Sequence, residues 1–191
     1  QLEEVVTSDS AQSIPVLPEL RLIGVDPEPA GLEGTRMSYM EAGEEHAKTV
    51  FLLHGIGSNS TGWRFVIDGP KDRYRVIAWN APGYYLSDNL KADTPINFQY
   101  ADAVAALLDA LAIDKVLMAG SSFGSLIASS FAFRHPKRVE LLALLGTARG
   151  QKWLPAEERA KRLRMREDSI RDGGIALAQA RWKNLIAENA S

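Results

Sequence analysis

The sequence has 191 residues, of which 46% are hydrophobic and 24% are charged, and its formal net charge at pH 7 is −2. This composition predicts one globular domain with a buried core and excludes a disordered chain. The small net charge predicts no nucleic-acid partner, and no apolar run approaches the length of a transmembrane helix, so no membrane partner is expected. Because the sequence contains no Cys, it excludes disulfides, thiolate metal sites and a cysteine nucleophile.

The chain begins with a polar segment that is followed by a predicted hairpin. Residues 1–13 are acidic and lack the basic start and apolar stretch of a signal peptide, so we interpret them as a flexible arm and expect a cytoplasmic protein. The segments "ELRLIGV" (19–25) and "TRMSYMEAG" (35–43) predict two strands. The turn-rich segment "DPEPAGLEG" between them predicts that the two strands form an opening hairpin.

Four short apolar runs follow, as expected for strands that are buried on both faces of a sheet. They cover residues 49–53, 74–79, 115–119 and 139–145. Between the second and third runs, apolar residues from Tyr100 to Leu111 recur with helical spacing. The β-α-β order predicts an α/β fold with a mostly parallel sheet and flanking helices, in which residues 14–146 form the core and functional loops lie at the carboxyl ends of the strands.

The pattern changes after this core. Residues 147–191 predict two helices that are separated at Asp172-Gly173-Gly174, with Pro155 near the start of the first helix. We interpret this segment as the start of a helical lid over the functional loops. The alternative is a pair of ordinary amphipathic helices with solvated charged faces.

One serine lies where a nucleophile is expected. Residues 120–124, "GSSFG", fit the pattern G-x-S-x-G, in which a strained turn between a strand and a helix exposes a serine hydroxyl. An apolar run precedes Ser122, and Phe123, Ile127 and Phe131 follow it at helical spacing. Ser122 is therefore the candidate nucleophile. The alternative is a small residue that only allows the strand and the helix to pack closely.

A second loop supplies the remaining part of an acyl-transfer site. The segment "HGIG" (54–57) follows the apolar run 49–53, and its small residues allow a substrate to approach the backbone. A developing oxyanion needs two preorganised N–H donors. We assign them to the backbone N–H groups of Phe123, the residue after the nucleophile, and of Ile56.

Four segments in order, "HGIG", "AWNAPGYYLSD" (78–88), "GSSFGS" (120–125) and "RHPKRVELLALL" (134–145), resemble the α/β-hydrolase fold family. Within it, the chain is most similar to 3-oxoadipate enol-lactonases and related hydrolases of small esters or C–C bonds. The resemblance implies a cofactor-independent serine hydrolase that cleaves a small ester or lactone through an acyl-enzyme on Ser122. Alternatives are C–C bond hydrolysis, haloperoxidase-like perhydrolysis, and a non-catalytic ligand-binding or interaction protein on the same scaffold. Epoxide hydrolases are disfavoured, because by resemblance they carry a carboxylate at the position of Ser122.

The sequence departs from the family pattern in its acid and base. In the family both follow the nucleophile, but here only His135 does, and thirteen residues of helix place it roughly 20 Å from Ser122. We expect His54 to stabilise its own loop and His46 to be exposed. We therefore expect the catalytic His, the acid and the last strands of the sheet to be missing from these residues. We expect the native molecule to have further sequence that supplies them, either in the same polypeptide or in a second chain that carries the C-terminal part. A homo-oligomer is the alternative assembly.

Three aromatic residues are candidates for an apolar substrate pocket: Trp63, Tyr84 and Trp153. Each is equally compatible with a role in the core. The sequence contains no H-E-x-x-H motif, P-loop or G-x-G-x-x-G after a strand, so we expect no metal and no cofactor. The expected partner is a small-molecule ester or lactone substrate.

Overall fold

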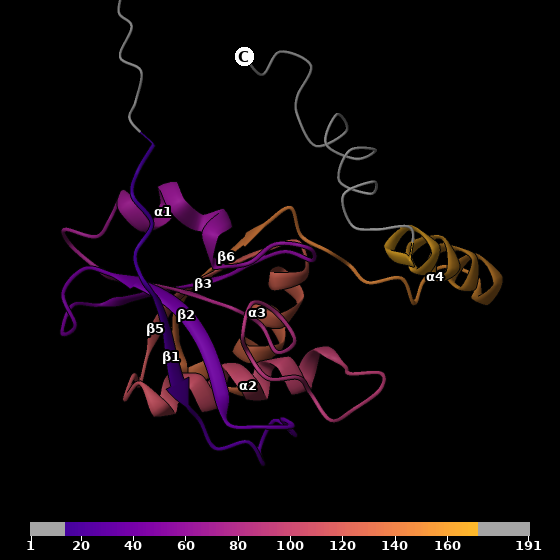
Figure 1. Ribbon diagram of the computed structural model, residues 1–191, viewed down its shortest axis with the longest axis horizontal. Coiled ribbons are helices and arrows are strands. Elements are labelled where there is room, and N and C mark those ends of the chain that lie inside the picture. The colour runs from indigo at the N-terminus through magenta and orange to yellow at the C-terminus, as the bar shows by residue number, and fades with distance from the viewer. Residues whose placement is uncertain (1–13, 172–191) are drawn as a thin grey trace, which may run out of the picture. The chain divides into compact units, whose positions relative to one another are not determined.

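The computed structural model describes residues 14–171 and divides into two compact units, residues 1–148 and 149–191. The arm expected over residues 1–13 and the second helix expected after Gly174 lie outside the described residues. Within the first unit, a mixed sheet lies between helices on both of its faces (Figure 1).

The described residues of the first unit form a six-stranded sheet in the order β1-β2-β4-β3-β5-β6. Its strands are β1 (Leu20–Gly24), β2 (Arg36–Ala42), β3 (Thr49–Leu53), β4 (Arg75–Trp79), β5 (Val116–Ser121) and β6 (Val139–Leu145). The pairs β1–β2 and β2–β4 are antiparallel, whereas β3 pairs in parallel with β4 and β5, and β5 pairs in parallel with β6. The predicted hairpin and mostly parallel α/β sheet are thus confirmed.

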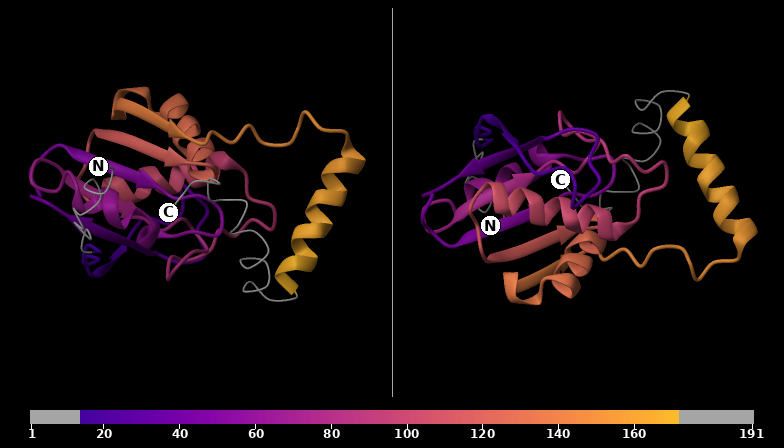
Figure 2. Two further views of the ribbon diagram at one scale, coloured as in Figure 1. Left: turned by 90° about the horizontal axis from the view of Figure 1, so that it is seen from above. Right: turned by 90° about the horizontal axis from the view of Figure 1, so that it is seen from below.

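Helices cover the two faces of this sheet because side chains of successive strand residues point to opposite sides. On one face lie the short helices η1 (Ser60–Trp63) and α1 (Arg64–Asp68), whose Ile67 packs with Met40 and Leu52. On the other lie α2 (Asn97–Ala110) and α3 (Phe123–Arg134), which join the larger core cluster with Phe51 and Trp79. Seen from below, α2 and α3 run along the sheet (Figure 2).

The strand β6 forms one edge of the sheet within residues 14–171. It follows the short helix η2 (Pro136–Arg138) and pairs on one side with β5, from Val116↔Val139 to Ser121↔Leu145. Its leucines remain open to solvent in the described part of the chain, with Leu141 56% exposed. The strand thus carries an apolar edge, although its sequence is that of a strand buried on both sides.

The second unit contains one described helix, α4 (Ala156–Arg171). Glu157 and Glu158 lie in its first turn and Arg171 in its last, which suits the helix dipole. The ion pair between Arg162 and Glu158 has the i,i+4 spacing that supports an exposed helix. One of the two predicted helices is therefore confirmed, and its role as a lid stays a prediction.

Candidate active site

Ser122 lies at a sharp turn between β5 and α3. Its backbone has φ 51° and ψ −111°, a conformation that a residue with a Cβ rarely adopts. Glycines make the close packing possible: an ideal Cβ placed on Gly120 would lie 2.4 Å from the Gly124 carbonyl oxygen, and one on Gly124 would lie 2.2 Å from the Leu53 carbonyl oxygen. The pattern G-x-S-x-G therefore forms the strained turn that the sequence predicted.

The loop 54–57 meets this turn because β3 and β5 are neighbours. Leu53 pairs with Gly120 at the carboxyl ends of these parallel strands, so the segments that follow both strands leave the sheet side by side. An ideal Cβ on Gly55 would lie 3.4 Å from the Ser122 Cβ and 4.0 Å from its Oγ. The structure thus brings the candidate nucleophile and the candidate oxyanion loop together.

The two predicted oxyanion donors belong to these two neighbouring segments. Phe123 is the first residue of α3, where the backbone N–H has no acceptor within the helix. Ile56 follows Gly55 in the loop and is 54% exposed. The amino end of α3 also carries the positive end of the helix dipole, which favours negative charge near Phe123. The donor roles of these two N–H groups remain a prediction.

His54 links the oxyanion loop to the loop that follows β4. The Ala81 backbone N–H donates to Nε2 over 3.1 Å, so Nε2 must be unprotonated, and Nδ1 donates its proton to the Gly55 carbonyl over 2.9 Å. Burial lowers the pKa of the imidazole below its ordinary value of 6.5, which favours this neutral form. With both nitrogens engaged by backbone groups, His54 has no lone pair for Ser122, and it holds the loop as expected.

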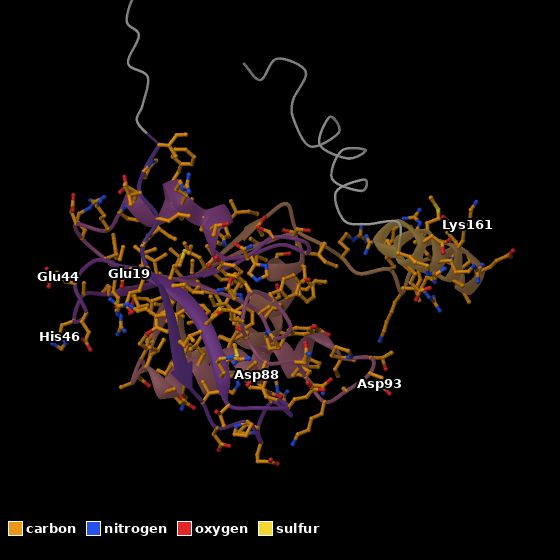
Figure 3. All side chains as sticks on the ribbon, viewed as in Figure 1. Glu19, Glu44, His46, Asp88, Asp93 and Lys161 are labelled. Carbon is orange, nitrogen blue, oxygen red and sulfur yellow. The ribbon has the colours of Figure 1, made fainter. Side chains whose placement is uncertain are left out.

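The other two histidines lie away from the nucleophile. His46 is exposed in the turn before β3, at the amino ends of the parallel strands, and Figure 3 shows it beside Glu44 at the edge of the molecule. His135 ends α3, and its ring lies 4.9 Å from that of Phe131. Three carboxylates that precede the nucleophile are paired with basic side chains: Asp68 with Lys71, Asp88 with Arg36, and Asp102 with Arg134.

Two tyrosines connect the site to a cavity of about 440 Å³. The ring of Tyr84 lies 4.8 Å from that of His54, and the ring of Tyr100 meets Phe123 edge-on at 5.1 Å. Burial raises the pKa of both phenols, and for Tyr84 a hydrogen bond to the Gly57 backbone lowers it in part. Both side chains are therefore neutral at pH 7. They line the cavity with Glu33, Pro82, Gly83, Asn89, Leu90, Ala92 and Pro95.

The two tryptophans predicted for substrate binding, Trp63 and Trp153, are not among the residues that line this cavity. Trp63 is half-buried at the end of η1 and packs against the core cluster that contains Met40 and Leu52. Trp153 belongs to the second unit, where it is 67% exposed and its Nε1–H donates to the Gly150 carbonyl over 3.0 Å. The substrate-binding roles of Trp63, Tyr84 and Trp153 stay predictions.

A buried polar network that the sequence did not reveal shapes the 81–88 loop. Asn80 accepts the Ser60 backbone N–H and donates to the Ser38 hydroxyl over 2.9 Å. The Ser38 hydroxyl donates to the Tyr85 carbonyl, and the Ser87 hydroxyl donates to that of Asn80. These bonds hold a loop in which Tyr85 has φ 37°, and thereby fix the neighbouring Tyr84. Only Asn80, a small polar residue directly after β4, gives a local sequence signal for such a network.

Two further properties concern only the residues that the structure describes. None of their His, Asp and Glu side chains gather in a group of three or more that could hold a metal ion. None of the helices among them is both long enough and apolar enough to span a membrane.

A serine at a strand–helix turn lies beside a second loop at the carboxyl edge of the parallel strands of an α/β sheet. The family model for the alpha/beta hydrolase fold matches residues 48–167, which is more than half of the chain. The chain belongs to the alpha/beta hydrolase fold family.

Individual relatives point in the same direction. A 2-hydroxy-6-oxononadienedioate/2-hydroxy-6-oxononatrienedioate hydrolase from Comamonas testosteroni is 37% identical over 120 residues, which cover 61% of this chain and 41% of the relative. The structure of a meta-cleavage product hydrolase from Pseudomonas fluorescens is 29% identical, with a TM-score of 0.58 over 66% of this chain and 44% of that one. A bacterial membrane phospholipase A is 30% identical, with a TM-score of 0.61 over 68% and 40%. The chain thus spans about two fifths of the length of the curated relative.

Proposed function

We propose that this protein is a hydrolase in which Ser122 attacks a carbonyl carbon of a small-molecule substrate. The observation that carries the proposal is the strained backbone of Ser122, with φ 51°, directly beside the loop that contains Gly55. A strained residue persists only where the surrounding structure enforces it, and such residues concentrate at active sites. The backbone N–H groups of Phe123 and Ile56 would receive the oxyanion that forms on the attacked oxygen.

The chemistry follows from these positions. The Ser122 Oγ forms a bond to the carbonyl carbon, its proton passes to a base, and the carbonyl electron pair moves onto the oxygen. When that oxygen re-forms the carbonyl, the bond to the leaving group breaks and the leaving group takes up a proton. Water then releases the acid and restores Ser122. None of the three histidines is assigned as the base. Both ring nitrogens of His54 are hydrogen-bonded to backbone groups, His46 lies in the turn before β3, and His135 lies at the far end of α3 from Ser122.

The relatives favour C–C bond hydrolysis over the ester or lactone hydrolysis expected from the sequence. A 2-hydroxy-6-oxo-dienoate contains no ester bond, so its hydrolysis must cleave a C–C bond beside the 6-oxo carbonyl. This cleavage uses the same first step, addition of the serine to a ketone carbonyl. Ester cleavage remains the second candidate, supported by the 30% identity to a phospholipase A.

The test compares wild-type protein with Ser122→Ala on two substrates, each in the assembly that includes the sequence expected to supply the base. 2-Hydroxy-6-oxononadienedioate is followed by loss of its conjugated dienol absorbance, and 4-nitrophenyl acetate by release of nitrophenolate. We expect faster turnover of the dienedioate and a loss of about 10³-fold or more in kcat for Ser122→Ala on both substrates. Faster turnover of the ester would make ester hydrolysis the first candidate function and C–C bond hydrolysis the second. Equal activity of wild type and variant on both substrates would refute a nucleophilic role for Ser122.

A further inference from the structure

The buried hydroxyl of Ser125, three residues after Ser122, belongs neither to the proposed attack nor to the proposed oxyanion donors. Ser125 lies in the first turn of α3 and is fully buried. Its Oγ lies 2.5 Å from the Ser122 carbonyl oxygen and 3.0 Å from the Ala148 backbone nitrogen. An amide N–H can only donate and a carbonyl can only accept, so the proton arrangement is fixed. The Ala148 N–H donates to Ser125 Oγ, and the Ser125 hydroxyl donates to the Ser122 carbonyl.

The other polar group of the Ser122 backbone is held by the same stretch of chain. The Ser122 N–H donates to the Leu145 carbonyl over 2.9 Å, at the end of β6. Ala148 follows three residues later and is the last residue of the first compact unit. Residues 145–148 therefore anchor the Ser122 backbone twice, directly through its N–H and, through the Ser125 hydroxyl, at its carbonyl. The Ser122 carbonyl also accepts the Ser125 backbone N–H over 3.0 Å, a bond that does not involve the hydroxyl.

We infer that Ser125 is a positioning residue, whose hydroxyl ties the nucleophile turn to residues 145–148 and so helps to keep Ser122 in its strained conformation. Two hydrogen bonds that pass through one hydroxyl in a buried site strengthen each other. Alanine would fit the space and has the higher helix propensity, so packing and helix formation do not account for serine here. The inference rests on the proposed function, because the position of the Ser122 hydroxyl affects catalysis only if this hydroxyl attacks the substrate.

The test compares Ser125→Ala with a matched control, Ser129→Ala. Ser129 lies one turn further along α3, and its hydroxyl donates to the Ser125 carbonyl over 2.8 Å within the helix. Amide hydrogen exchange is measured by NMR for the backbone N–H groups of Ser122 and Ala148. We expect both to exchange about tenfold faster in Ser125→Ala and at the wild-type rate in Ser129→Ala. Exchange of either amide in Ser125→Ala at the rate seen in Ser129→Ala would overturn the inference.

A second measurement separates this inference from the proposed function. A serine-directed fluorophosphonate is applied to wild type and both variants, and adduct formation on Ser122 is followed by intact mass, with Ser122→Ala as the blank. We expect Ser125→Ala to lower the maximal labelling rate severalfold while the half-saturating probe concentration stays unchanged. Faster exchange with labelling equal to that of Ser129→Ala would refute a positioning role. Wild-type labelling no faster than the blank would refute the proposed function, and the exchange rates would still decide whether Ser125 anchors the turn.

Discussion

The contact between Gly124 and β3 gives the sharpest prediction about the nucleophile turn. In Gly124→Ala the new Cβ would lie 2.2 Å from the Leu53 carbonyl oxygen, 2.6 Å from the Leu53 carbonyl carbon and 2.8 Å from the His54 carbonyl oxygen. All three atoms belong to the backbone, so no side chain can rotate away. Either α3 or the end of β3 must move by about an ångström, which is the range of overpacking that costs about 1–3 kcal/mol or more.

The net effect includes a smaller gain. Alanine is about 1 kcal/mol better than glycine inside a helix, and Gly124 is the second residue of α3. Because three backbone contacts fall below 3.0 Å, we place the strain at the upper end of the range and expect a net loss of about 2–3 kcal/mol in the free energy of unfolding. The displaced β3 end carries the oxyanion loop, so we also expect slower fluorophosphonate labelling of Ser122.

The matched control is Gly24→Ala. Gly24 ends β1, and an ideal Cβ there would meet no atom within 4 Å. Urea unfolding of wild type and both variants, followed by circular dichroism, gives the two changes in the free energy of unfolding. A loss in Gly124→Ala within about 0.5 kcal/mol of that in Gly24→Ala would refute the packing argument, since that is the scatter of ordinary surface substitutions.

Three further comparisons test the backbone of Ser122, the burial of His54 and the buried pair of Glu41 and Arg75. At Ser122, glycine relieves the strain of φ 51° and alanine does not, so Ser122→Gly should unfold in urea with a free energy about 1 kcal/mol above that of Ser122→Ala, and equal values would contradict strain. The pKa of His54 is lowered in the folded protein, so the unfolded chain takes up the proton first as the pH falls. Wild type should therefore keep its full stability above pH 6.5 and lose up to about 1.4 kcal/mol per pH unit below it, whereas His54→Gln should show a flatter profile, and parallel profiles would refute this role. Glu41→Gln leaves the buried Arg75 without its charged partner, 3.0 Å away, and should cost about 3–5 kcal/mol in urea unfolding, whereas Glu140→Gln at an exposed pair should change little, and similar losses in the two variants would contradict the difference in burial.

The sheet was predictable because its signal is local. A strand that is buried on both faces has a run of apolar residues, and β3 and β6 begin and end where their runs do. The nucleophile turn was predictable for a related reason, since its constraints act on residues close in sequence and select glycine at positions 120 and 124. In both cases one short window of sequence contains the physical cause.

The surroundings of the site were not predictable, because their contacts join distant segments. Asn80 and Ser38 are far apart in the sequence, and neither belongs to a motif that anticipates their hydrogen bond. The contact between Tyr84 and His54 likewise depends on the loop after β4 folding back over the loop after β3. An aromatic residue in a loop has the same sequence signature in a core and in a pocket, so only the folded chain separates the two roles.

The strain at Ser122 is held by contacts from three directions, and this explains why the turn tolerates it. The end of β3 presses on the turn through Gly124, the end of β6 accepts the Ser122 N–H, and the Ser125 hydroxyl donates to the Ser122 carbonyl. A strained conformation costs about 1–3 kcal/mol, which is comparable to the contribution of one or two buried hydrogen bonds. No single contact among these is therefore strong enough to hold the strained conformation with much free energy to spare. The conformation of Ser122 therefore depends on β6 as well as on its own glycines, although β6 lies at the edge of the described sheet.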